Sequence, residues 1–193
     1  MTEHETDHSL GAGLTYEDAL PLGWRRLEGP PPSTQLAQLN LGNEAVLRAV
    51  TVLAEYRPET GEEHTWQAQE LARLDFKLNL LLDLVGQILT RGLSLPPARP
   101  LRLGAQALEW ICPRDEAPPP ASHAVVSLYL HNAYGRPLEL PGRVAAVENL
   151  PADARVRVVF VGLGETVQEL LDKLIFRHHR RSIAQARTPR EAG

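Results

Sequence analysis

The chain has 193 residues, of which 43% are hydrophobic, and it carries a formal net charge of −4 at pH 7. This length fits one ordinary domain, or a small domain with an oligomerisation arm, and the hydrophobic fraction excludes wholesale disorder. The mildly acidic balance argues against a general binder of polyanions. Cys112 is the single cysteine, which suits a reducing compartment. Because acidic residues stand near the N-terminus in place of a secretory signal, we predict a cytoplasmic protein.

The N-terminal part of the chain is expected to contain a tail, an extended segment and a helix. Residues 1–13 are polar and contain glycine, which is typical of a disordered tail. Residues 14–27 are expected to be extended around Pro21, before a proline-rich break. Asn43 is a suitable N-cap, so the first helix is expected to begin after it. Its apolar face would consist of Val46, Leu47, Val50 and Leu53.

A long helix from about residue 62 to residue 91 is the most informative segment. Its apolar residues recur at alternating steps of three and four, as the a and d positions of a coiled coil do, and further leucines widen the apolar surface. A helix that is apolar nearly all round needs burial on several sides, so we expect a bundle made with copies of itself. The predicted oligomerisation residues are Leu71, Leu74, Leu78, Leu81, Val85 and Ile88.

The two helices are expected to form an antiparallel hairpin, so that residues 35–92 would be a helical oligomerisation insertion. The most apolar window of the long helix covers residues 78–89 and is interrupted by polar side chains. A window this short does not span a bilayer, and no membrane insertion is expected.

Beyond Pro100 the hydrophobic pattern changes from a helical period to the alternation of strands. From residue 101 the alternation shifts phase near Leu108, as a bulge or a tight turn would make it do. Strands are also expected over residues 124–130 and 154–161, and residues 138–147 are expected to form a hairpin or a kinked strand. Short strands so close together predict a small antiparallel β-barrel over residues 101–163, within one domain that spans residues 14–193.

A final helix is expected over residues 165–187. Its buried stripe would consist of Val167, Leu170, Leu171, Leu174 and Ile175.

The sequence offers no convincing set of catalytic residues. Gly162 and Gly164 follow a strand and precede a helix, as in a dinucleotide-binding loop, but Val167 stands at the third glycine position. A plain glycine turn explains this segment better. The adjacent histidines at residues 178–179 lack the spacing of metal ligands, so we expect no metal site. We therefore predict that the protein is not an enzyme.

The final helix carries a block of arginines. Arg177 and Arg181 are four residues apart, so their forked guanidinium groups are suited to clamp a phosphate. The alternative is that cations near a helix C-terminus favour the helix dipole and solvate its outer face, which is the commoner role of a charge run. Nucleic-acid binding is not expected, because it needs a basic surface with aromatic platforms and the chain is acidic overall.

Four segments resemble, in their order and spacing, the atypical PilZ proteins, the tetramer-forming branch described as cyclic di-GMP receptor-like. Together they span most of the chain, from about residue 14 to residue 187. They are residues 16–21 (YEDALP), 74–78 (LDFKL), 101–110 (LRLGAQALEW) and 176–185 (FRHHRRSIAQ).

The resemblance implies an α+β fold: a six-stranded PilZ-like β-barrel, a C-terminal helix and a helical insertion whose heptads assemble a tetramer. Ordinary family members bind cyclic di-GMP through an Arg-x-x-x-Arg motif ahead of the barrel, which is followed by a second motif, Asp/Asn-x-Ser-x-x-Gly. In this chain Arg102, Gly104 and Ala107 replace the acid or amide, the serine and the glycine. The Arg-x-x-x-Arg pattern occurs instead at Arg177 and Arg181, after the barrel.

We therefore predict a bacterial, non-enzymatic signalling or adaptor protein of cyclic di-GMP circuits that assembles with itself and acts by protein–protein interaction. It would not bind the nucleotide, and its signalling partner is not identified by the sequence. The alternative is a cyclic di-GMP receptor with a non-standard arginine site, formed by Arg177, Arg180, Arg181 and Arg102, with Trp110 stacking on a base. Cyclic di-GMP is the one ligand implied, and no other cofactor is expected.

Overall fold

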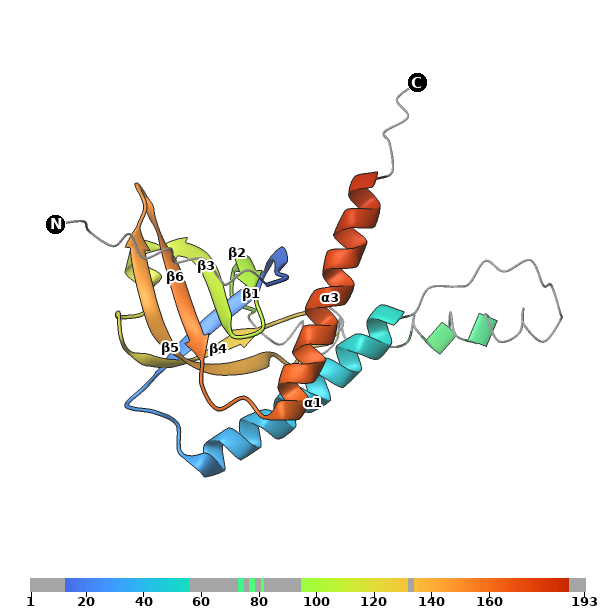
Figure 1. Ribbon diagram of the computed structural model, residues 1–193, viewed down its shortest axis with the longest axis horizontal. Coiled ribbons are helices and arrows are strands. Elements are labelled where there is room, and N and C mark those ends of the chain that lie inside the picture. The colour runs from blue at the N-terminus through green and yellow to red at the C-terminus, as the bar shows by residue number, and fades with distance from the viewer. Residues whose placement is uncertain are drawn as a thin grey trace, which may run out of the picture.

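The computed structural model describes residues 13–55, 73–74, 77–78, 81, 95–131 and 134–187. Its strands close into a barrel, α1 runs beneath the barrel, and α3 crosses α1 (Figure 1). This arrangement confirms the predicted barrel with its C-terminal helix. The strands are β1 (Tyr16–Leu27), β2 (Ala98–Leu103), β3 (Ala107–Pro113), β4 (His123–Leu128), β5 (Leu138–Asn149) and β6 (Asp153–Phe160). The helices are α1 (Ser33–Glu55), the short 3₁₀ helix η1 (Arg114–Glu116) and α3 (Glu165–Arg187).

The strands follow one another around the barrel in the order β1-β2-β3-β6-β5-β4, and all neighbouring pairs are antiparallel. Alternate side chains of each strand point inward and fill the interior, as in other small barrels. In β3 these are Leu108, Trp110 and Cys112, and in β6 they include Val156 and Val158, all of them buried.

The predicted barrel range of residues 101–163 is wrong at its N-terminal side, because β1 belongs to the barrel as well. The first half of β1 pairs with β2 and its second half with β4. Without β1 these two strands would each present an edge of unpaired backbone groups. Pro21 interrupts the sequence signal of β1, and Pro21 lies at the point where the strand changes partner.

Two irregularities in the strand pattern have local causes. The phase shift near Leu108 arises because β2 and β3 are separate strands joined by a tight turn, in which the Gly104 N–H donates to the Ala107 carbonyl over 2.8 Å. Residues 138–149 form one continuous strand. Of the two predicted alternatives for this segment, a hairpin or a kinked strand, the structure therefore shows the single strand. A side chain at Gly142 would place its Cβ 2.4 Å from Val158 Cγ1, so only glycine lets β5 approach β6 there.

The prediction that Asn43 caps the first helix is wrong, because α1 begins ten residues earlier, at Ser33. Asn43 lies inside the helix and is 1% exposed. Its side-chain amide donates to the Glu139 carbonyl over 2.7 Å and accepts from the Glu139 N–H over 2.8 Å. A helix-interior asparagine is unfavourable by propensity alone, and these two bonds to β5 offset that cost.

Asn40 makes a second pair of side-chain bonds, one turn earlier in α1. It donates to the Gly162 carbonyl and accepts from the Gly164 N–H, both over 2.9 Å. Gly162 has a φ of 71°, a backbone conformation that favours glycine. The segment is therefore a glycine turn, and the Gly164 N–H at the start of α3 is already bonded within the chain.

One hydrophobic core joins the barrel to both helices. It includes Val46, Leu47 and Val50 from α1 and Val167, Leu171 and Ile175 from α3. Leu170 and Leu174 are partly buried against it. The first helix therefore packs within the protomer, although the sequence placed it in an oligomerisation insertion over residues 35–92.

The predicted long helix is described at five positions, residues 73–74, 77–78 and 81, which are helical. The predicted residues Leu71, Val85 and Ile88 lie outside the described residues. So do residues 1–12 of the predicted tail and the turn between the two helices of the predicted hairpin.

Candidate functional site

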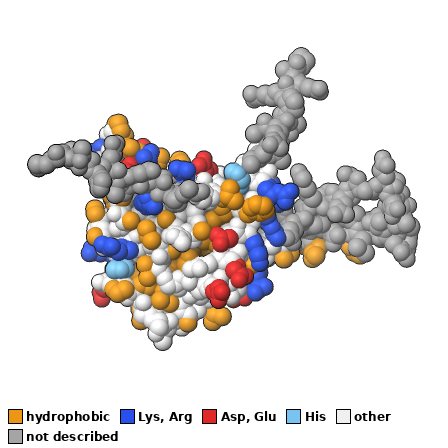
Figure 2. Space-filling model, viewed as in Figure 1, with side chains coloured by type: hydrophobic (Ala, Val, Ile, Leu, Met, Phe, Trp, Pro, Cys, Tyr) orange, Lys and Arg blue, Asp and Glu red, His pale blue; other side chains and the backbone are white. Residues whose placement is uncertain are grey.

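Arg177 and Arg181 line a cavity of about 130 Å³ between α1 and α3. Strand β1 contributes Tyr16 to the lining, α1 contributes Thr51, and the segment after β4 contributes His131. Figure 2 shows Lys and Arg side chains gathered along one side of α3. The structure thus brings two of the four predicted ligand-binding arginines together, and we call this hollow the α1–α3 cavity.

His178 forms one wall of the α1–α3 cavity. Its ring packs on that of Tyr16 with 3.7 Å between the centroids, and the Tyr16 hydroxyl donates to Asp18 Oδ2 over 3.0 Å. Burial lowers the pKa of His178; Asp18 opposes this shift, and Arg181 adds to it. Burial, and then Asp18, raises the pKa of Tyr16, so this phenol stays protonated as the hydrogen-bond donor.

Arg180 lies outside the lining of the α1–α3 cavity. Its guanidinium carbon lies 5.8 Å from the centroid of the Phe176 ring, at cation–π distance. Phe176 is itself exposed. The third arginine of the predicted site is thus placed apart from Arg177 and Arg181, although all three belong to one helix.

Arg102 is also separate from the α3 arginines. It projects from β2 on the outer face of the barrel and pairs with Glu17 of β1 over 2.9 Å. Tyr16 and Glu17 are consecutive in a strand and point to opposite faces, so the α1–α3 cavity and Arg102 lie on opposite sides of β1. The structure therefore places Arg102 in a different hollow from Arg177 and Arg181.

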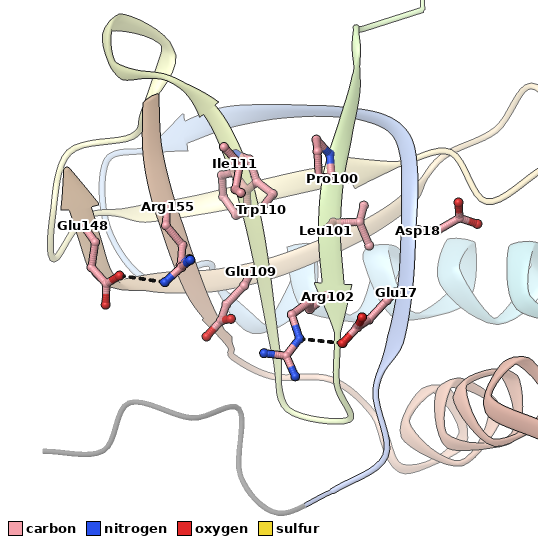
Figure 3. A pocket seen from close by; sticks show the side chains of 10 residues that line it. All are labelled: Glu17, Asp18, Pro100, Leu101, Arg102, Glu109, Trp110, Ile111, Glu148 and Arg155. Carbon is pink, nitrogen blue, oxygen red and sulfur yellow. Dashed lines mark hydrogen bonds and ion pairs between the residues drawn. The ribbon is translucent and has the colours of Figure 1, made fainter. Parts of the chain in front are cut away.

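Arg102 lines an open groove of about 440 Å³ on the outer face of the barrel (Figure 3). Acidic and basic side chains alternate across its strands: Glu148 pairs with Arg155 over 3.2 Å, and Glu109 lies between Arg102 and Arg155. Trp110 is 1% exposed, so its ring has no free face on which a base could stack. The predicted stacking role of Trp110 is wrong, because the alternation of β3 turns this ring into the barrel.

The segment that replaces the second nucleotide motif contributes to a third hollow, of about 480 Å³. Gly104, Ala105 and Gln106 of the β2–β3 turn lie across it from Phe176 of α3. Asp172 is the one charged residue among the described residues that line it. A phosphate in this hollow would therefore be repelled by the carboxylate of Asp172.

The described residues of the long helix are all exposed in the protomer. Leu74, Leu78 and Leu81 are 60%, 57% and 59% exposed, and their spacing of four and then three places them on one helix face. Arg73 and Lys77 beside them are exposed too. Exposed apolar stripes are typical of surfaces that associate with a partner.

Sequence reasoning missed three residues of the α1–α3 cavity: Tyr16, Thr51 and His131. They come from separate elements, and no sequence signal placed them beside Arg177, although Tyr16 opens the YEDALP segment. In the part of the chain that the structure describes, no cluster of three or more His, Cys, Asp or Glu is arranged to hold a metal ion. No helix there has the length and hydropathy to cross a membrane.

Comparisons with known proteins agree with this architecture. A family model described as "Atypical PilZ domain, cyclic di-GMP receptor" matches residues 47–188. Among solved structures, a pathogenic protein from Xanthomonas campestris is similar, with 25% sequence identity and a TM-score of 0.65 over 90% of this chain and 92% of that one. It is described as a new tetrameric PilZ domain self-assembled via an unusual helical bundle.

A second solved structure, YcgR from Escherichia coli in complex with c-di-GMP, shows only weak similarity. It has 13% identity and a TM-score of 0.37, over 46% of this chain and 38% of that one. No curated protein matches the chain.

Proposed function

Because the chain belongs to the atypical PilZ family, we propose that it is a non-enzymatic adaptor that assembles into a tetramer and acts by binding a signalling protein. The assembly would use the long helix predicted over residues 62–91, which we call the heptad helix. The barrel would present the surface for the partner. Residues 14–193 would form a single domain. The cytoplasmic location expected from the sequence is part of the same proposal.

The exposed stripe of Leu74, Leu78 and Leu81 is the observation that carries this proposal. Burying a leucine side chain contributes about 1.5–3 kcal/mol, so a stripe left in water forgoes a large stabilisation. The solved relative at 25% identity is a tetramer assembled via a helical bundle, which is the kind of structure that buries such a stripe. Four linked copies would also bind a multivalent partner more tightly than one copy does.

The proposal that the chain does not bind a nucleotide at the position usual for PilZ proteins is supported by the charges of the side chains there. Arg102 already pairs with Glu17, and the hollow at the β2–β3 turn contains Asp172. Both features disfavour a phosphodiester at this end of the barrel.

The second candidate function is a cyclic di-GMP receptor. The shared cavity of Arg177 and Arg181 is the observation that favours it, together with the description of the matching family. This candidate would rest on these two arginines, since Arg102 and Arg180 are placed elsewhere.

Removing the apolar stripe tests the adaptor proposal. We expect the full-length chain with Leu78→Asp and Leu81→Asp to give a monomer that remains β-rich, because both side chains are more than half exposed in the protomer. Light scattering coupled to size-exclusion chromatography gives the mass, and circular dichroism gives the fold. Leu41→Asp is the matched control, since Leu41 is an exposed leucine of α1 outside the heptads and should leave the tetramer intact.

A double variant that is still tetrameric would contradict the proposed interface. Loss of all structure would show instead that the heptad helix belongs to the core of the barrel. Titration calorimetry of the wild-type protein with cyclic di-GMP separates the two candidate functions, because saturable heat supports the receptor and its absence supports the adaptor.

A further inference from the structure

We propose that the α1–α3 cavity is a binding site for a single phosphoryl group, held by Arg177 and Arg181. This site goes beyond the adaptor function and does not depend on the tetramer. The charge, the geometry and the size of the cavity all favour such a ligand.

The charge of the lining selects for anions. Arg177 and Arg181 are the charged residues among the described residues that line the cavity, and Thr51 and His131 add polar groups. The other two hollows described above both contain carboxylates. No carboxylate is among the described residues that line the α1–α3 cavity, although Asp18 lies behind it and accepts a hydrogen bond from Tyr16.

The geometry favours a fixed site over two mobile surface cations. Arg177 and Arg181 are one helical turn apart and point to the same face of α3, where their guanidinium groups can converge on one ligand. The opposite walls come from α1, β1 and the segment after β4. Four elements that pack on one core hold these walls in place, which reduces the entropy lost when a ligand binds.

The size of the cavity restricts the ligand. Pockets that enclose a drug-sized ligand measure about 300–1,000 Å³, whereas this cavity measures about 130 Å³. It can enclose a phosphoryl group but not a whole cyclic dinucleotide. The phosphoryl group could belong to a phosphate monoester or to one diester linkage of a nucleotide, and the chemistry that binds it is the same.

Binding of inorganic phosphate to the full-length protein tests the proposal. Phosphate is titrated at constant ionic strength against a chloride reference, with calorimetry for affinity and thermal unfolding for stabilisation of the native state. We expect saturable binding that Arg181→Gln weakens about tenfold or more, because a hydrogen bond to a charged group is lost. Arg180→Gln is the matched control, since Arg180 is on the same helix, carries the same charge and faces Phe176.

Arg177→Gln repeats the test with the second arginine, and both variants are checked for native circular dichroism and native mass. Arg181→Lys keeps the positive charge but loses the forked guanidinium group. Its affinity for phosphate should therefore fall between those of wild type and Arg181→Gln. The proposal is overturned if phosphate gives no more stabilisation than chloride. It is also overturned if Arg180→Gln weakens binding as much as Arg181→Gln does.

Two competitors then identify the source of the phosphoryl group. Glycerol 3-phosphate represents the monoesters, and cyclic di-GMP represents the nucleotide diesters. Displacement of phosphate by glycerol 3-phosphate alone assigns the cavity to a monoester. Displacement by cyclic di-GMP as well assigns it to one linkage of the nucleotide, with the remainder of the ligand outside the cavity.

Discussion

Two leucine-rich helical segments of this chain have similar sequence patterns and opposite environments. In α1, Val46, Leu47 and Val50 are buried in the core of the protomer. In the heptad helix, Leu74, Leu78 and Leu81 are exposed. Hydrophobic periodicity therefore shows that a helix face needs a partner but does not show which partner it has.

Polar side chains account for part of this difference. Asn40 and Asn43 of α1 each bond a backbone N–H and a backbone carbonyl on the barrel side. These four bonds fix one register of α1 against the protomer, because any shift would leave buried polar groups unpaired. The described part of the heptad helix shows exposed Arg73 and Lys77 instead.

The largest expected difference in unfolding free energy is between two variants, each of which truncates one leucine of one segment. Leu47→Ala should lower the free energy of unfolding by about 2–5 kcal/mol at any protein concentration, because it leaves a cavity in the core. Leu78→Ala should change the stability of dilute, dissociated protein by no more than about 0.5 kcal/mol. Urea unfolding followed by circular dichroism over a range of protein concentrations measures both.

At concentrations where the protein is assembled, Leu78→Ala should also be destabilising, because the assembly binds only the folded chain. A loss for Leu78→Ala that does not depend on concentration would mean that both segments belong to one core.

A smaller loss of unfolding free energy is expected when the side-chain amide that bonds α1 to β5 is removed. Asn43→Ala should cost about 1–3 kcal/mol, because it leaves the N–H and the carbonyl of Glu139 without their partner. Asn40→Ala is the matched variant one turn away, and it should cost about 0.5–1.5 kcal/mol, since the bonds of Asn40 are more exposed to water. Thermal and urea unfolding give the two values, and equal costs would argue against burial as the cause.

The smallest effect concerns α3, the helix that packs across α1. Because the pKa of His178 is lowered in the folded state, the unfolded chain binds more protons as the pH falls below the ordinary value of 6.5. The stability that neutral His178 contributes is thus present above that pH and is lost on acidification. His178→Gln should flatten the pH dependence of the unfolding free energy over this window.

Asp18→Asn should act in the opposite direction, since the charge of Asp18 raises the pKa of His178 and so opposes the effect of burial. Urea unfolding at a series of pH values tests both variants. A His178→Gln profile as steep as that of wild type would place the pH dependence on other groups.

Much of the fold and the family could be predicted, because the signals are local or repeat along the chain. The alternation in residues 101–163 predicted a barrel, the helical period predicted the final helix, and the segments around residues 74–78 and 101–110 predicted the PilZ resemblance that the family model confirms. The misassignment of Asn43 shows the limit of such signals. An asparagine reads as a cap locally, and only its contact with Glu139 explains why it lies inside α1.

The candidate site shows the same limit. The sequence by itself determined that Arg177 and Arg181 share a helix face, because their spacing alone sets this geometry. Only the tertiary structure decided that Tyr16, Thr51 and His131 face them, and that Arg102 pairs with Glu17 on the other side of β1. The physical reason is that periodicity acts over a few residues, whereas a cavity is made by segments far apart in the chain.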